Sequence, residues 1–153
     1  MTNIHNLFKF VQSKNPEYPV PLRYKLLHKP DSIEEEDLIV KGNLDLRDTP
    51  ITSLPDNLQV RGGLYLGDTK ITSLPDNLKV RGDLYLFNTK ITSLPDNLQV
   101  GGHLSLRDTK ITSLPDNLKV GGHLYLTNTP ISKKYTEEEI RKMTPGVKGK
   151  ILL

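Results

Sequence analysis

The chain has 153 residues, which is enough for one domain with a hydrophobic core but short for two. It contains no cysteine, so disulfides, thiolate zinc sites and cysteine nucleophiles are excluded. The formal net charge is +3, but the positive excess lies in residues 133–153 and residues 38–132 are almost neutral, which argues against a nucleic-acid-binding solenoid.

Residues 1–37 are predicted to form a helical N-terminal cap. Thr2 or Asn3 can cap a helix whose apolar residues fall on one face: Ile4, Leu7, Phe8 and Val11. Four prolines then predict an irregular connection: Pro16, Pro19, Pro21 and Pro30. Ser32 with Glu35 is a capping-box pattern for a short turn before the first repeat.

One 20-residue unit recurs over residues 38–132, with the pattern V-x-G-x-L-x-L-x-[Asp/Asn]-T-x-I-T-S-L-P-D-N-L-x. Full copies begin at Val40, Val60, Val80 and Val100, and a partial copy runs from Val120 to Ser132. Alternation in V-x-G-x-L-x-L predicts strands, and the Asp-Thr and Pro-Asp-Asn steps predict turns. We therefore expect a mainly β protein, a parallel β-solenoid of about five coils with small helical caps at both ends.

Equivalent positions in a parallel solenoid form columns about 4.8 Å apart, and the inward columns are apolar. They are Val60/80/100/120, Leu44/64/84/104/124, Leu46/66/86/106/126, Ile51/71/91/111/131, Leu54/74/94/114 and Leu58/78/98/118. Threonines 49, 69, 89, 109 and 129 lie between core columns, so we expect each hydroxyl to bond a backbone group. The asparagines at 57, 77, 97 and 117 are expected at the other corner, where a left-handed conformation is tolerated, and the aspartates beside them to face water or cap amides.

The spacing Leu114-Pro115, then Leu124-Tyr125-Leu126, then Thr129 and Ile131 resembles the short 20-residue leucine-rich repeats of bacterial effector proteins. The regular VGGHLYL and ITSLPDNL segments also resemble small repeat proteins of bacteriophages and their hosts. Two departures stand out: the family's buried asparagine is threonine here, and V-x-G adds a second extended segment. A horseshoe and a flatter solenoid with two or three strands per coil both satisfy the columns. The resemblance implies a protein-binding scaffold.

Residues 133–153 are predicted to form a C-terminal cap. Thr136 with Glu139 is a second capping box, followed by an apolar face at Ile140 and Met143. Pro145-Gly146 ends that helix. The final apolar residues 151–153 are expected to pair with or cover the last coil.

The copies differ mainly around the L-x-L strand, on its outward side, where leucine-rich repeats bind partners. Tyrosine, phenylalanine and arginine gather there, which is typical of the centre of a protein interface. The alternative is that the aromatic side chains only stabilise the sheet by cross-strand stacking. The predicted partner-binding residues are Asp45, Arg47, Tyr65, Asp83, Tyr85, Phe87, His103, Arg107, His123 and Tyr125.

The function expected first is a non-catalytic protein-interaction module, a phage or bacterial protein that binds and inhibits a host or defence component. The alternative is a nucleic-acid-binding solenoid that stacks bases on tyrosines and holds phosphates with Lys70, Lys90 and Lys110. A passive structural element is a third possibility. We expect no catalytic residues, no cofactor and no metal, since His103 and His123 have only Asp83 as a third candidate ligand.

No apolar segment approaches the roughly 20 residues of a membrane span, and the first residues lack the pattern of a signal peptide. We therefore expect no membrane partner and a cytoplasmic location, which is the host cytoplasm if a phage encodes the protein. The expected state is a monomer or a weak homo-oligomer.

Overall fold

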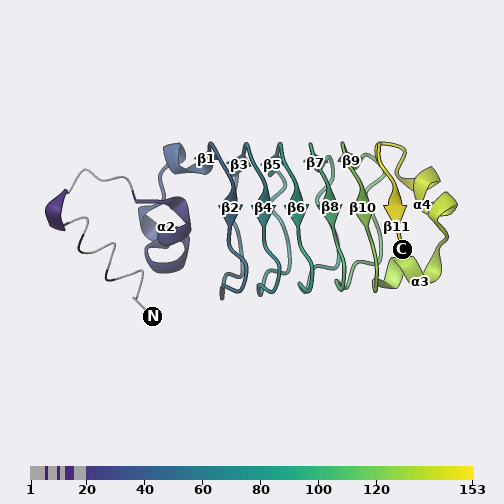
Figure 1. Cartoon of the computed structure of the whole chain (residues 1–153), viewed down its shortest axis with the longest axis horizontal. Helices are drawn as coiled ribbons and strands as arrows, with labels where there is room; N and C mark the ends of the chain where they lie inside the picture. Colours follow the sequence, from purple (N-terminus) through teal and green to yellow (C-terminus); the bar gives the residue numbers. More distant parts are fainter. Residues whose placement is uncertain (1–5, 7–9, 11–12, 16–19) are drawn as a thin grey trace.

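The computed structural model describes residues 6, 10, 13–15 and 20–153. Residues 39–126 wind into a parallel β-solenoid whose 20-residue coils stack along a nearly straight axis, with helices at both ends (Figure 1). The predicted solenoid is confirmed, with two short strands in each coil. The predicted helical face formed by Ile4, Leu7, Phe8 and Val11 lies outside the described residues.

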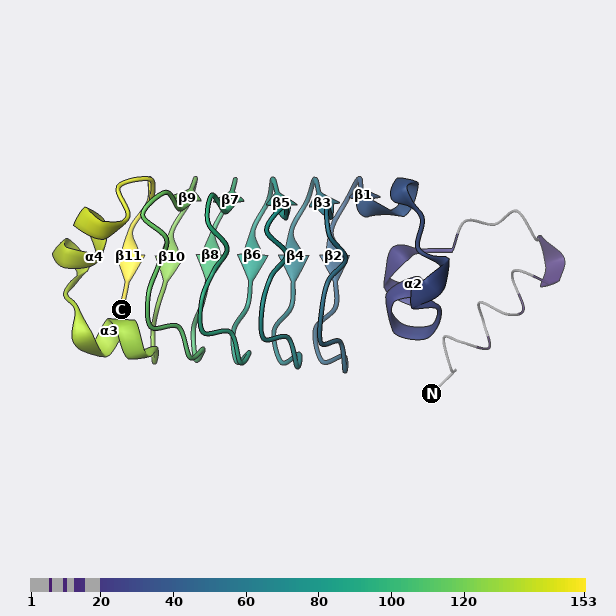
Figure 2. The same ribbon diagram turned by 180° about the vertical axis from the view of Figure 1, so that it is seen from behind.

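Two parallel sheets run along the solenoid, and both views place sheet A along its upper border (Figures 1 and 2). Sheet A consists of β1 (Ile39–Val40), β3 (Gln59–Val60), β5 (Lys79–Val80), β7 (Gln99–Val100) and β9 (Lys119–Val120). Sheet B consists of β2 (Leu44–Asp45), β4 (Leu64–Tyr65), β6 (Leu84–Tyr85), β8 (Leu104–Ser105), β10 (Leu124–Tyr125) and β11 (Ile151–Leu152).

The register repeats without slippage, so each residue pairs with its equivalent in the next coil. Leu44 pairs with Leu64 in sheet B, and Val60 pairs with Val80 in sheet A. The inward columns consequently form one continuous aliphatic core, in which almost every predicted member is buried. Leu114 is only partly buried, although it still packs against that core.

The corners of the coils use the polar residues as expected. The five column threonines are buried, and each hydroxyl donates to the carbonyl oxygen three residues earlier at 2.6–2.7 Å. The residue before each threonine adopts a positive φ, between 53° and 59°, which Asp and Asn tolerate better than other side chains. At the opposite corner the left-handed conformation occurs in only two of the four predicted asparagines, Asn57 and Asn97, with φ of 61° and 62°. Asn117 donates from Nδ2 to Oδ1 of Asn97 at 2.7 Å.

The N-terminal cap differs from the predicted irregular connection, because α2 (Leu22–His28) forms between the prolines. Pro21 precedes the helix, where its fixed φ is no obstacle, and no proline interrupts the next seven residues. Leu22 and Tyr24 are buried. The proline pattern was therefore a signal for the ends of this helix.

The predicted capping box at Ser32 and Glu35 is also wrong. Two short 3-10 helices, η1 (Pro30–Ser32) and η2 (Glu35–Leu38), lead into β1. Ser32 ends η1 and its hydroxyl donates to the Lys29 carbonyl oxygen at 2.7 Å, so it does not start the next turn. The carboxylate of Asp37 instead accepts from the Glu34 N–H at 2.8 Å.

The C-terminal cap contains α3 (Pro130–Lys134) and α4 (Glu137–Met143) before β11. The predicted capping box of Thr136 and Glu139 is confirmed, and Ile140 is buried. The predicted pairing of the final apolar residues is confirmed as well, because β11 pairs in parallel with β10. None of the described helices has the length and hydropathy of a membrane span.

Candidate functional site

The predicted partner-binding residues gather on the outward side of sheet B and at its two margins. Strand pairing aligns Asp45, Tyr65, Tyr85 and Tyr125 in one column, which also contains Ser105 of β8 and Leu152 of β11. None of the ten residues is buried, and Arg47 and Arg107 are exposed. We call the ten residues together the sheet B face: Asp45, Arg47, Tyr65, Asp83, Tyr85, Phe87, His103, Arg107, His123 and Tyr125.

A row of planar side chains runs along this face. The guanidinium of Arg47 lies 5.4 Å from the ring centroid of Tyr65, within cation–π distance. The rings of Tyr65 and Tyr85 stack with centroids 5.3 Å apart and an interplanar angle of 12°. Tyr125 lies beyond Ser105 and meets the rings of His103 and His123 edge-on at 6.1 and 6.2 Å. The rings are thus held by one another.

Two glycines of the same coil provide room for aromatic rings. A Cβ built on Gly63 would lie 2.7 Å from Oη of Tyr65, so that ring covers the glycine. A Cβ on Gly67 would overlap the ring of Phe87, which reaches back from the next coil. The residues that vary between copies of the repeat are therefore linked in pairs here, because each of these glycines leaves space that an aromatic ring fills.

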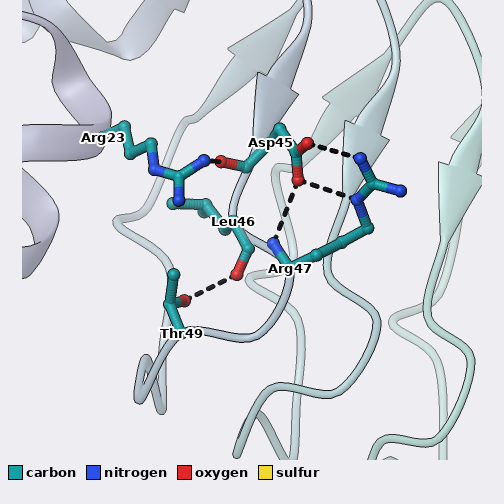
Figure 3. A network of polar contacts seen from close by, with 5 residues as sticks. All are labelled: Arg23, Asp45, Leu46, Arg47 and Thr49. Carbon is teal, nitrogen blue, oxygen red and sulfur yellow. Dashed lines mark hydrogen bonds and ion pairs between the residues drawn. The ribbon is translucent and has the colours of Figure 1, made fainter. Parts of the chain in front are cut away.

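The first coil carries a local charge network (Figure 3). The carboxylate of Asp45 accepts from Nε and Nη2 of Arg47 at 3.0 and 2.7 Å, and also from the Arg47 N–H. The side-chain hydrogen bonds from Arg47 lower the pKa of the Asp45 carboxyl most; burial acts in the opposite direction, and the Arg47 N–H lowers the pKa further. Arg23 of α2 donates to the Asp45 carbonyl oxygen at 2.6 Å, and so covers the edge of β2.

Burial also affects the tyrosine at the middle of the row. It raises the pKa of the Tyr85 hydroxyl, and the nearby Asp83 carboxylate raises it further. The Tyr85 hydroxyl lies 3.5 Å from Oδ2 of Asp83. The single hydrogen of this hydroxyl is directed at Asp83, so its oxygen can accept a hydrogen bond from a bound partner.

At one margin of the sheet B face, side chains in one column bond the backbone of the next coil, a feature that the sequence reasoning missed. Each accepting atom lies opposite the N–H of the residue 20 positions later or, at the last coil, of Lys150, the residue before β11. The bonds go to Asn43 Oδ1 from Gly63 N (2.7 Å), to Asp83 Oδ1 from His103 N (2.7 Å), to His103 Nδ1 from His123 N (2.8 Å), and to His123 Nδ1 from Lys150 N (2.9 Å). The signal was present, because every residue in this column except Gly63 carries an acceptor atom.

We call these four side-chain-to-backbone hydrogen bonds the polar ladder. They determine whether the two histidines can bind a metal ion. Their rings stack with centroids 4.8 Å apart, and each Nδ1 lone pair accepts a backbone N–H. A neutral imidazole that accepts at Nδ1 carries its proton on Nε2, so neither nitrogen has a free lone pair for a metal ion. Among the described residues, no three His, Asp or Glu side chains are grouped so as to hold a metal. His103 and His123 therefore hold coils together.

No family model matches the chain, and no curated protein matches it either. The likeness to leucine-rich repeats of bacterial effectors and phages stays a prediction. What the protein does is therefore inferred from the chemistry of its surfaces.

Proposed function

We propose that the protein is a non-catalytic interaction module that binds a protein partner through the sheet B face. The observation that carries the proposal is the row of half-exposed aromatic side chains on in-register strands, with arginine beside it. Tyrosine and arginine dominate the centres of protein interfaces, because they offer large contact areas together with hydrogen-bonding groups.

The fixed geometry of this row supports the proposal. Tyr65 packs on Gly63 and stacks on Tyr85, and Phe87 packs on Gly67, so these rings hold defined positions before any partner arrives. A preorganised surface loses little conformational entropy on binding. Stacking also stabilises the sheet, and the two roles are compatible because the outer side of each half-buried ring remains accessible.

The covered ends of the solenoid support a monomer as the binding species. Arg23 bonds the outer edge of β2, and Arg141 of α4 bonds the carbonyl oxygens of Val147 and Gly149 beside β11. Helices lie beyond the outer strands of sheet B at both ends (Figure 1). Covering an edge strand prevents edge-to-edge association. The likeness to effector and phage repeats supports a bacterial host or defence protein as the partner, in the cytoplasm.

Nucleic-acid binding on the tyrosines is less well supported by the geometry. The rings of Tyr65 and Tyr85 already contact each other across paired strands. A base can enter between them only if those strands separate, so these two rings cannot serve as successive stacking platforms.

The repeat itself supplies the substitutions that test the proposal. Serine occupies the tyrosine column at Ser105, so replacing Tyr65, Tyr85 and Tyr125 by serine uses a residue that this column accommodates. Wild type and the triple variant are used to capture proteins from bacterial lysate, with identification by mass spectrometry. A matched control replaces Lys70, Lys90 and Lys110, exposed residues away from the tyrosine column, by glutamine.

We expect a protein that wild type and the lysine control capture and that the folded tyrosine variant does not. Circular dichroism and size-exclusion chromatography establish that each variant is folded. Capture of every partner by the folded tyrosine variant as efficiently as by wild type would contradict the proposal.

A further inference from the structure

The outward side of sheet A carries a groove that is distinct from the sheet B face. Its volume is about 790 Å³, and it spans β5, β7, β9 and the segment that follows α4. Four basic residues line it: Lys79, Arg81, Lys119 and Lys148. All four are exposed.

The solenoid register gathers these cations from distant parts of the chain. Lys79 and Lys119 occupy the first position of β5 and β9, in a column where β3 and β7 have Gln59 and Gln99. Val147 bridges to Val120 beyond the last coil, which places Lys148 next to β9. The charge of the repeat body is thus near neutral in total but segregated by face.

The cations of the groove are not neutralised by the protein. None of the four forms an ion pair within the part of the chain that the structure describes. Asp76 is the one carboxylate among the lining residues, so the groove carries three more positive than negative groups, four cations against one anion. Unpaired cations in a concave surface attract an anionic ligand and concentrate it there.

The other lining residues indicate what kind of anion fits. Asn77, Asn97 and Gln99 add amide groups, and Gly101 and Gly121 add exposed backbone. The valines and the leucine of the lining are buried beneath them, and none of the described lining residues is aromatic. Although much of the accessible lining is apolar, none of the described lining residues presents an exposed apolar or aromatic side chain that could anchor a protein partner. A phosphate backbone needs only cations and polar donors.

We propose that this groove binds the phosphate backbone of a single-stranded nucleic acid without reading its sequence. The four cations follow one groove, which suits a single strand. The dissociation constant expected for such contacts at physiological salt lies between about 1 and 100 µM. Release of counterions from about four phosphates gives a slope of log affinity against log salt of about −2.8.

The alternation of Gln and Lys in the column again supplies the test. The variant Lys79→Gln with Lys119→Gln places glutamine at this position in all four strands from β3 to β9, as β3 and β7 already have it, so we expect the fold to be retained. The matched control, Lys70→Gln with Lys110→Gln, removes the same charge from exposed residues outside the groove. Binding of a fluorescent oligothymidine of about 15 nucleotides is followed by anisotropy between about 50 and 200 mM salt.

We expect the groove variant to bind more weakly than wild type, with the slope reduced to about −1.4, and the control to keep the wild-type slope. An oligoglutamate of equal charge is expected to bind more weakly than the oligonucleotide. Three results would overturn the proposal: no binding at about 50 mM salt, equal slopes for the groove variant and wild type, or equal binding of the oligoglutamate. The tyrosine variants of the sheet B face test protein binding independently of this proposal, because none of their substitutions lies in the groove.

Discussion

Replacement of His103 tests whether the polar ladder holds neighbouring coils together. Nδ1 of His103 accepts the His123 N–H at 2.8 Å, and the two rings stack at 4.8 Å. His103→Leu removes the acceptor and leaves a partly buried N–H without a partner, at a cost of about 1–2 kcal/mol. Loss of the ring contact adds about 0.5–1 kcal/mol. We therefore expect a total loss of about 2 kcal/mol.

The matched variant is His103→Asn, because Asn43 already performs this role in the first coil, with Oδ1 2.7 Å from the Gly63 N–H. This variant keeps an acceptor and loses only the ring contacts with His123 and Tyr125, so its cost is about 0.5–1 kcal/mol. Urea unfolding followed by circular dichroism gives both values, provided that the m-value is unchanged. Equal losses for His103→Leu and His103→Asn would refute the structural role of Nδ1.

Three further predictions use the same kind of measurement. Thr89→Val removes the buried hydroxyl that donates to a carbonyl oxygen at 2.7 Å and should cost about 1 kcal/mol, whereas Thr89→Ser keeps that hydrogen bond. Equal losses of stability in the valine and serine variants would contradict this prediction. Gly67→Ala should destabilise by about 1–3 kcal/mol because its Cβ displaces Phe87, and should be nearly neutral in a Phe87→Ala background, as a double-mutant cycle shows. Partial burial acts to raise the pKa of Asp37, but its backbone hydrogen bond and Lys25 lower the pKa overall. The stability lost in Asp37→Asn should therefore be largest above about pH 4 and vanish as pH falls through the folded pKa. A loss of stability that does not change with pH would contradict this prediction.

The solenoid body could be predicted because every coil satisfies the same constraints. Leu64, Leu84 and Leu104 must all be apolar because they share one core, and the repetition of leucine at this position indicates its burial several times over. Thr89 and its equivalents followed from their place between two core columns. Repetition thus replaced the alignment of related sequences that is normally needed.

The ends and the ladder were harder to predict because each occurs once or in changing letters. The helix α2 has no second copy, and prolines on both sides of a segment are as typical of irregular chain as of the ends of a short helix. In the polar ladder, the different residue types Asn43, Asp83 and His103 all accept a backbone hydrogen bond, so comparing residue types does not reveal their shared role. The charge along the chain does not predict the basic groove, because the register brings its cations together from distant positions.

The central claim, that a protein binds the sheet B face, is tested most directly by the affinity of a purified captured partner for single-site variants. Calorimetric titration compares Tyr65→Ser, Tyr85→Ser and Tyr125→Ser with Lys90→Gln, a charge change at an exposed residue outside the tyrosine column. We predict that at least one tyrosine variant weakens binding by about tenfold or more, since interface hot spots cost over about 1.4 kcal/mol, and that Lys90→Gln leaves it unchanged. Unchanged affinity in all three folded tyrosine variants would contradict the claim.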